Sequence, residues 1–316
     1  MKKDLRIVFM GTPEFAVGTL KLLVENHYQI VGVITAPDRP AGRGQKLQQS
    51  DVKKYTLSQN LQLLQPTNLK DADFLHELKA LNANVQIVVA FRMLPEVVWR
   101  MPKYGTFNLH ASLLPDYRGA APIHWAIING EEKTGVTTFF IDEKIDTGAI
   151  ILQKEVAIKK DETVGTLHDT LKDIGSKLVI ETLKLIESGT LTTTIQPKIE
   201  QPKTAYKLNK ENCQIDWSHN LEDIYNKIRG LNPFPAAWTY LKTKEGTLMV
   251  KLFEVATETI IPAESLGTIT ATKNELKVST KGGYLIIKEM QLPGKRKMDI
   301  RSLLNGFNFS EGDKML

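Results

Sequence analysis

The chain has 316 residues, of which 42% are hydrophobic and 24% are charged, and its formal net charge is +5. These values are typical of a soluble globular protein of about two domains and exclude a disordered chain. No stretch approaches the roughly 18 continuous apolar residues of a membrane span, and the single cysteine, Cys213, excludes a disulfide framework, so we expect a cytoplasmic protein with no membrane partner.

The first half of the chain alternates strand patterns with helix patterns. Thr12 is expected to cap the first helix, with Pro13 in its first turn, and a long helix is expected over residues 163–188. Strands are expected at residues 5–10, 29–35, 85–90, 105–111, 134–141 and 148–158. This alternation predicts a doubly wound, Rossmann-like, mostly parallel sheet.

The pattern changes after residue 189. Residues 190–207 are rich in Thr, Gln, Pro and Lys, which is a linker composition. Short strand patterns then follow at residues 237–242, 249–256, 267–272, 275–280 and 284–290. Five short strands at this spacing predict a small OB-like β-barrel. We therefore expect a first domain at 1–189, a linker at 190–207 and a second domain at 208–316.

Several common chemistries have no motif in this sequence. There is no G-x-G-x-x-G for a dinucleotide, no phosphate-binding loop and no G-x-S-x-G for a serine hydrolase. The six histidines show no metal-ligand spacing, so no metal is expected.

Two polar residues end the strand expected at residues 105–111. Asn108 and His110 are two positions apart, so their side chains leave the same face of that strand. Ligands bind at the carboxyl ends of parallel strands, and an amide beside an imidazole suits an oxygen that gains negative charge. The alternative is structural: Asn108 caps a turn, and His110 is a core histidine with satisfied hydrogen bonds.

Asp146 lies between the last two strands expected in the first domain. A carboxylate near His110 could fix the tautomer of its ring. The alternative is that Asp146 forms an Asx turn.

These motifs together resemble a known family, the formyltransferases that use 10-formyltetrahydrofolate. The resemblance rests on Asn-Leu-His-Ala-Ser-Leu-Leu-Pro at residues 108–115, Arg-Gly-Ala-Ala-Pro at 118–122 and Asp-Thr-Gly at 146–148. Pro-Asp-Arg-Pro-Ala-Gly-Arg-Gly at 37–44 and Leu-Pro-Gly-Lys-Arg at 292–296 extend it nearly end to end. They point to the branch of the family that acts on methionyl-tRNA.

The resemblance implies roles for particular residues. Asn108 and His110 would hold the oxyanion formed when the methionyl α-amine attacks the formyl carbon. Asp146 would orient His110 and assist proton movement from the amine. The formyl-folate co-substrate would be contacted by Ser112, Leu113, Leu114 and Pro115. One departure is visible, because Phe91-Arg92-Met93 stands where the family often shows Tyr-Gly, and this puts the detailed folate contacts in doubt.

Basic residues gather in two places. Residues 37–54 hold five positive and two negative side chains, and the family resemblance implies that Arg39, Arg43 and Lys46 contact the acceptor stem of initiator methionyl-tRNA. Lys295, Arg296 and Lys297 form the sharpest cluster of the second domain, which we expect to bind tRNA as well. The alternatives are a solvated loop and ordinary surface lysines. We expect the chain to act as a monomer.

Two other functions stay open at this point. One is a different formyl-folate enzyme, acting on glycinamide ribonucleotide or a sugar amine or hydrolysing the formyl-folate. The other is a non-catalytic RNA-binding protein on an inactive enzyme scaffold, against which the intact set of Asn108, His110 and Asp146 speaks.

Overall fold

Two units make up the protein, whose computed structural model describes residues 3–41 and 46–316. The first unit consists of Met1–Gly119, Thr134–Val156 and His168–Thr204. The second consists of Ala120–Lys133, Ala157–Leu167 and Ala205–Leu316. No helix in these described ranges is long and apolar enough to cross a bilayer.

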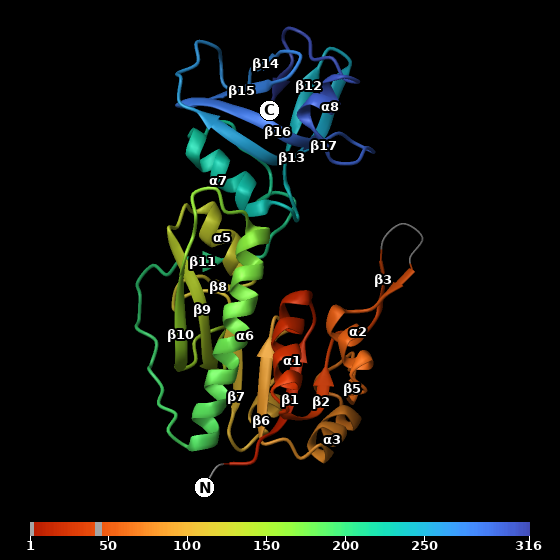
Figure 1. Ribbon diagram of the computed structural model, residues 1–316, viewed down its shortest axis with the longest axis vertical. Helices are drawn as coiled ribbons and strands as arrows, with labels where there is room; N and C mark the ends of the chain where they lie inside the picture. Colours follow the sequence, from red (N-terminus) through yellow and green to blue (C-terminus); the bar gives the residue numbers. More distant parts are fainter. Residues whose placement is uncertain (1–2, 42–45) are drawn as a thin grey trace. The chain divides into compact units, whose positions relative to one another are not determined.

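A seven-stranded sheet forms the centre of the first unit (Figure 1). Its spatial order is β10 (Ile150–Ala157), β9 (Lys133–Phe140), β7 (Thr106–His110), β6 (Val85–Val89), β1 (Arg6–Gly11), β2 (Gln29–Ile34) and β5 (Leu63–Leu64). The pairs from β7 to β5 are parallel, and β9 joins β7 in antiparallel register. The predicted Rossmann-like, mostly parallel sheet is confirmed.

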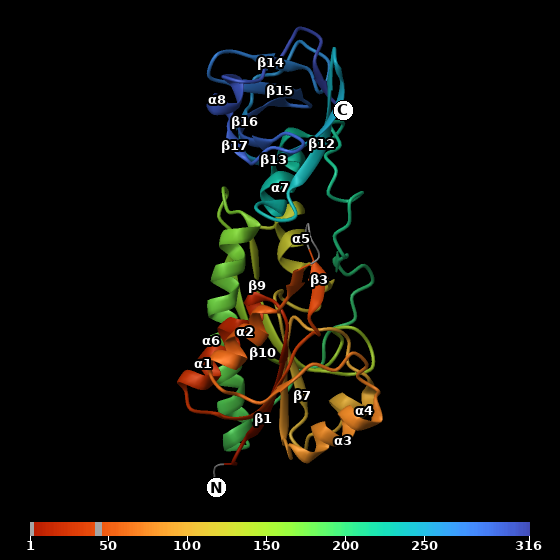
Figure 2. The ribbon, with the colours of Figure 1, turned by 90° about the vertical axis from the view of Figure 1, so that its right-hand side faces the viewer.

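Helices cover both faces of this sheet (Figure 2). On one face, Thr19 of the first helix and Ser176 of the longest one share a hydrogen bond of 3.2 Å. On the other face, the buried side chains of Val8, Met10 and Val88 pack against two further helices. These helices are α1 (Glu14–Glu25) and α6 (Val164–Ser188) on the first face, and α3 (Ala72–Ala80) and α4 (Glu96–Trp99) on the second.

The start of α1 differs from the prediction. The helix begins at Glu14, and Pro13, rather than Thr12, occupies the capping position with no side-chain hydrogen bond. Because proline has no N–H and a fixed φ, it ends the preceding loop in extended geometry and leaves Thr12 one position too early to cap.

The strand order reverses between β1 and β6, since β2 and β5 extend to one side and β7 to the other. In open α/β sheets ligands bind at such a switch point, outside the carboxyl ends of the strands. Asn108 and His110 lie at the carboxyl end of β7, one strand away from this point.

An antiparallel barrel forms the second unit. Its strands follow the order β14 (Ile269–Ala271), β15 (Leu276–Thr280), β16 (Gly283–Gln291), β13 (Gly246–Glu258), β12 (Ala237–Thr243) and β18 (Lys314–Met315), with β17 (Met298–Asp299) beside β16. A bridge between Thr268 and Lys314 brings the two edges together. The predicted OB-like barrel is confirmed, although β17 and β18 are too short for their pattern to have predicted them.

Two helices of the second unit pack against each other, and α7 also packs on the barrel. They are α5 (Pro122–Ile128) and α7 (Leu221–Leu231). The remaining elements are β3 (Arg39–Ala41), β4 (Lys46–Gln48), α2 (Asp51–Ser58), β8 (Arg118–Gly119), β11 (Thr204–Ala205) and α8 (Ile300–Leu304).

Candidate active site

The carboxyl end of β7 presents Asn108 and His110 from one face of the strand, as their spacing predicts. His110 is 6% exposed and Asn108 is half-buried. Asn108 is paired in register with Val88 of β6 and with Phe139 of β9. A strand held on both sides gives these two side chains a rigid base.

The ring of His110 is held by a backbone carbonyl. Its Nε2 lies 2.8 Å from the carbonyl oxygen of Tyr117, and since a carbonyl can only accept, Nε2 carries the hydrogen. The ring also meets Phe139 edge-on, with the ring centroids 6.5 Å apart. The other ring nitrogen, Nδ1, lies 3.8 Å from Asp146 Oδ2, which is beyond hydrogen-bond distance. Tyr117 therefore fixes the tautomer, and Nδ1 is the nitrogen that faces Asp146.

The carboxylate of Asp146 reaches across 27 positions of the sequence. Its Oδ2 accepts the N–H of Gly119 at 2.9 Å, and the side chain is 14% exposed. The local Asx-type bonds of this loop go to another residue, because Asp142 Oδ1 accepts from the Lys144 N–H and the Thr147 hydroxyl. The turn role is thus filled by Asp142, and the carboxylate of Asp146 points toward His110.

Asn108 carries a buried polar atom with no partner. Of the residues that the structure describes, only Asn108, Arg92 and Asp313 have a buried side-chain nitrogen or oxygen without a hydrogen bond, and in Asn108 this atom is Oδ1. Leaving such an atom unpaired costs about 1–3 kcal/mol. Because Oδ1 is an acceptor, a ligand N–H or O–H beside the end of β7 would satisfy it.

The stretch that follows β7 turns inward. Ser112 is fully buried and its hydroxyl donates to the carbonyl of Asp116 at 2.7 Å, and Leu114 is 3% exposed. Leu113 and Pro115 are half-buried. Of the four residues expected to contact the folate, Leu113 and Pro115 therefore offer side-chain surface, and Ser112 and Leu114 support the turn.

Polar side chains from two neighbouring strands clamp the same stretch. The Thr137 hydroxyl of β9 donates to the carbonyl of Ser112 at 2.6 Å and accepts from the N–H of Leu114 at 3.2 Å. Gln153 of β10 donates to the carbonyl of Leu114 at 2.9 Å. The backbone that follows the catalytic candidates is fixed in position by these bonds.

The departure at Phe91-Arg92-Met93 has a structural account. Arg92 donates from its two terminal nitrogens to the backbone carbonyls of Pro66 and Thr67. The arginine thus anchors the loop after β5, while the side chain of Met93 is 68% exposed. A glycine at position 92 could form neither of these bonds.

The first basic segment contains the short strands β3 and β4, which pair in antiparallel register. Arg39 is exposed. Arg43 lies outside the described residues, and Lys46 is placed only by its backbone in β4. Of these three basic side chains, the structure therefore describes only that of Arg39.

Two lysines of this segment are already paired. Lys53 Nζ lies 2.6 Å from Asp38 and Lys54 Nζ lies 2.9 Å from Asp51. The hydrogen bond from the Lys53 ammonium lowers the pKa of the Asp38 carboxyl. These pairs cancel both acidic residues of the segment, so its local excess of +3 comes from Arg39, Arg43 and Lys46.

The second basic cluster lies on the loop between β16 and β17, where Lys295, Arg296 and Lys297 are all exposed. Lys297 Nζ is paired with Glu289 at 2.6 Å and lies 5.3 Å from the ring centroid of Phe253. Lys295 and Arg296 have no ion-pair partner in the described ranges. The three residues are therefore not equivalent as phosphate ligands.

A pocket of about 520 Å³ within the second unit was not predicted from the sequence. Its lining includes Lys207, Lys210 and Lys251 together with Phe234 and Trp238. Phe234 is 78% exposed, and the Lys210 ammonium lies 5.2 Å from the ring centroid of Trp238. Trp238 itself is buried, so Phe234 is the aromatic ring that is open to solvent. Lysines together with one exposed aromatic ring suit a nucleic acid, which offers both phosphates and bases.

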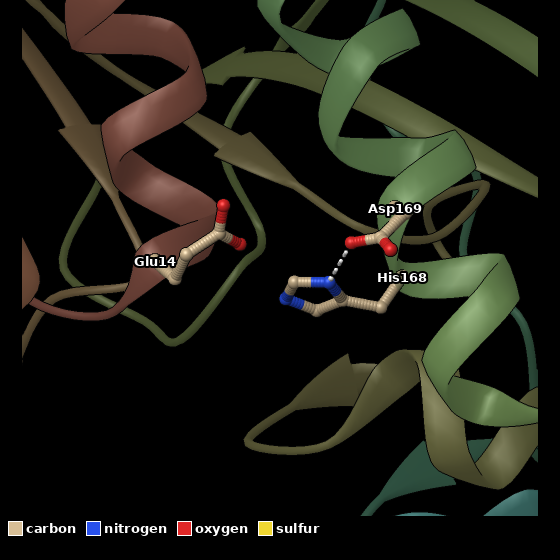
Figure 3. Close-up of side chains that lie close together, drawn as sticks. All are labelled: Glu14, His168 and Asp169. Atoms are coloured by element: carbon tan, nitrogen blue, oxygen red, sulfur yellow. Dashed lines mark hydrogen bonds and ion pairs between the residues drawn. The ribbon is translucent and has the colours of Figure 1, made fainter.

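Three side chains that could in principle bind a metal ion lie close together among the described residues. Glu14, His168 and Asp169 lie near the amino end of α1 and in α6, with Asp169 bonded to His168 at 3.2 Å (Figure 3). Lys172 Nζ is hydrogen-bonded to Glu14 at 2.8 Å and to Asp169 at 3.3 Å. The lysine ammonium bridges the two carboxylates, so these side chains form an ion-pair network between the two helices.

Comparison with known proteins places the chain in a family. The formyl transferase family model matches residues 5–183, and the model of the formyl transferase C-terminal domain matches residues 207–308. The methionyl-tRNA formyltransferase of Flavobacterium johnsoniae is 60% identical over 313 residues, covering 99% of each chain. That of Bacteroides thetaiotaomicron is 51% identical over 321 residues, again with 99% of each chain covered. The chain belongs to the methionyl-tRNA formyltransferase family.

Solved structures share the fold at low sequence identity. A sugar 3N-formyl transferase crystallised with dTDP and 5-N-formyl-THF matches with a TM-score of 0.65 and 21% identity, over 93% of this chain and all of that one. An N-formyltransferase from Helicobacter canadensis matches with a TM-score of 0.62 and 20% identity, over 90% of this chain and 98% of that one. The chain thus shares the fold of these enzymes.

Three contributors to the site were not found from the sequence. Tyr117 and Gly119 act through backbone groups, which carry no side-chain signature. Gln196 lies in the segment expected to be a linker, yet it is 7% exposed. An isolated glutamine in a polar stretch gives no pattern from which burial could be predicted.

Proposed function

We propose that the chain transfers the formyl group of 10-formyltetrahydrofolate to the α-amine of methionyl initiator tRNA. The arrangement of His110 Nδ1 facing Asp146, with the amide of Asn108 on the same face at the end of β7, carries this proposal. Full-length relatives at up to 60% identity, named for this activity, support it. The product, N-formylmethionyl-tRNA, starts translation, which places the chain in the cytoplasm, where we propose that it acts as a monomer.

The reaction requires a site for a transient oxyanion. The amine nitrogen attacks the formyl carbon, the carbonyl oxygen takes up negative charge, and the bond from carbon to the folate nitrogen then breaks. Asn108 offers the N–H of its side-chain amide, Nδ2, to the developing charge from the end of β7, since its Oδ1 can only accept. His110 offers Nδ1 when that nitrogen is protonated, because its Nε2 hydrogen is committed to Tyr117. One such donor is worth roughly 2.7–4 kcal/mol in a dry site.

Proton movement falls to Asp146. An α-amine has an ordinary pKa of about 7.7–8.0, so it must lose a proton to attack and a second one after attack. One oxygen of Asp146 accepts from Gly119, which leaves the other to take a proton from the amine. Of these two protons, one is released to solvent, and the other is passed from Asp146 to the folate nitrogen as its bond to the formyl carbon breaks.

The proposal for the folate stretch rests on Leu113 and Pro115, whose side chains are half-buried at the turn after β7. They would present apolar surface to the ring system of the co-substrate. Ser112 and Leu114 would support this surface from below, through the bonds of the turn.

We assign the tRNA-binding role to basic residues in both units. These are Arg39, Arg43 and Lys46 in the first and Lys295, Arg296 and Lys297 in the second, and the lysines that line the pocket of the second unit are added to them. Arginine and lysine neutralise backbone phosphates, so binding through these residues should weaken as salt rises.

A formylation assay with 10-formyltetrahydrofolate tests the proposal directly. Purified protein is given initiator Met-tRNA, elongator Met-tRNA or free methionine, and formyl transfer to each is measured. We expect turnover on charged initiator tRNA and slow or no reaction with free methionine. Rapid turnover of free methionine, or none on charged initiator tRNA, would contradict the proposal. Formylation of an amino sugar, or hydrolysis of the formyl-folate alone, would identify a different member of the wider enzyme group.

A further inference from the structure

The side chain of Gln196 is buried and makes four hydrogen bonds within the first unit. Its Nε2 donates to the carbonyl of Asp146 at 2.9 Å and to the carbonyl of Gly148 at 2.8 Å. Its Oε1 accepts from Nη2 of Arg118 at 2.5 Å and from Nε at 3.2 Å. The amide therefore joins the loop that carries Asp146 to the residue that precedes Gly119.

These bonds enclose Asp146 from both of its ends. Gln196 holds the backbone of Asp146, while the Gly119 N–H holds its carboxylate. Asp146 has a φ of +55°, a conformation that a residue with a side chain adopts at a cost. In this conformation the carbonyl of Asp146 accepts the hydrogen bond from Gln196, and that bond stabilises the strained backbone.

The segment that carries Gln196 is itself anchored to the sheet. Thr194 pairs with Ile150 of β10 through two backbone hydrogen bonds of 2.8 Å. Further along, the N–H of Tyr117 donates to the carbonyl of Lys203 at 2.6 Å, and Tyr117 is the residue whose own carbonyl holds His110. We call residues 194–203 the connector. The connector bonds to the backbone of Asp146 and to Tyr117, which holds the ring of His110.

We propose that Gln196 is a positioning residue for the formyl transfer, which sets the position of the Asp146 carboxylate relative to His110 Nδ1. The inference rests on the proposed function, because it assigns a role to a partner of Asp146. Gln196 is buried, and its amide hydrogens are taken up by the carbonyls of Asp146 and Gly148, so it acts through the loop backbone. A misplacement of about 1 Å can cost roughly 100-fold in rate.

Two variants of Gln196 separate its donors from its acceptor. Gln196→Glu keeps an oxygen for Arg118 but loses the two hydrogens that reach Asp146 and Gly148. Gln196→Ala loses all four bonds. Gln201→Ala is the matched control, since Gln201 is an exposed glutamine of the same connector.

The measurements are kcat and KM for charged initiator tRNA, together with the unfolding temperature of each variant. We expect both Gln196 variants to lower kcat roughly 10- to 100-fold with KM for tRNA nearly unchanged, and Gln201→Ala to match the parent. The Glu variant stays informative if the Ala variant fails to fold. An unchanged kcat in Gln196→Glu would overturn the inference.

A double-mutant comparison with Asp146→Asn distinguishes positioning from general structural support. If Gln196 acts through Asp146, its substitution should lower kcat little further in the Asp146→Asn background. An additive loss would overturn the inference, because Gln196 would then act elsewhere. If Asp146→Asn alone left kcat unchanged, the role proposed for Asp146 would fail first, so the two failures are distinguishable.

Discussion

Main-chain groups, two residues apart, hold the two titratable side chains of the site. The carbonyl of Tyr117 takes the Nε2 hydrogen of His110, and the N–H of Gly119 binds the carboxylate of Asp146. Because backbone groups supply both bonds, the side chains at positions 117 and 119 are not needed for them. The stretch after β7 must therefore keep its backbone in a fixed conformation, so that these two main-chain groups stay in position.

Asn108 differs from these two residues in lacking a partner for its buried oxygen. We expect Asn108→Ala to lower kcat by roughly two to three orders of magnitude, since it removes one donor to the oxyanion. The affinity for tRNA should be retained, because no basic residue changes. The free energy of unfolding should stay nearly level, since the loss of packing is offset by the loss of an unsatisfied polar atom.

The measurement combines single-turnover formylation with tRNA binding and thermal unfolding. Asn274→Ala, at an exposed position in the turn between β14 and β15, serves as the control. A loss of tRNA binding in Asn108→Ala with an unchanged rate at saturating tRNA would contradict the role of Asn108 in the chemical step.

At the scale of elements, the connection between β9 and β10 determines where Asp146 lies. Gly148 closes this connection, and a Cβ added there would lie 1.7 Å from the carbonyl oxygen of Phe140. No side chain fits at that distance without moving backbone. The glycine of the Asp-Thr-Gly motif is thus required for the close approach of two strand ends.

Gly148→Ala should therefore shift the loop that carries Asp146. We expect a destabilisation of roughly 1–3 kcal/mol, as found for overpacked sites, and a lowered kcat. Chemical denaturation and the formylation rate measure the two effects. Gly306→Ala, where an added Cβ meets nothing within 4 Å, should change neither. Parent-like stability and activity in Gly148→Ala would show that the loop has more freedom than its backbone contacts indicate.

Elements with a strong apolar period were predictable from the sequence. The long helix was expected at residues 163–188 and is observed at Val164–Ser188, because a buried face at helical spacing leaves a clear pattern. The shared face of Asn108 and His110 followed from the period of a strand. Gln196 could not be predicted, since its partners lie about 50 residues away and its neighbours are polar. The fold and the shared face of Asn108 and His110 were thus predictable, and the contacts that hold those side chains were not.

At the scale of the whole molecule, charge is distributed unevenly. The net charge is +5, while residues 37–54 carry an excess of +3 and residues 242–301 hold 11 basic and seven acidic residues. Ion pairs decide how much of this excess can reach a phosphate. Lys53 and Lys54 are neutralised by their partners in the first unit, and Lys297 by Glu289 in the second.

The salt dependence of tRNA binding should reflect this distinction. Lys295→Ala and Arg296→Ala should each weaken binding. Each should also reduce the magnitude of the slope of log K against log salt by about 1, the value of one phosphate contact. Lys297→Ala should change the slope less, because its ammonium is already paired with Glu289. Titrations at several salt concentrations give the slopes, with Lys244→Ala, an exposed lysine of the same unit, as the control. An equal effect of all four substitutions would mean that the loop between β16 and β17 has no special role.

The connector gives the junction of the two family domains an unusual property. The formyl transferase match ends at residue 183 and the C-terminal match begins at residue 207, so Gln196 and Lys203 fall in the gap between them. Junctions between domains usually tolerate insertion and recombination. Here the register of the chain between Thr194 and Lys203 is set at both ends by contacts to the supports of Asp146 and His110. A catalytic module exchanged between relatives must therefore carry its own chain through residue 204, and changes of length within residues 194–203 would displace these contacts.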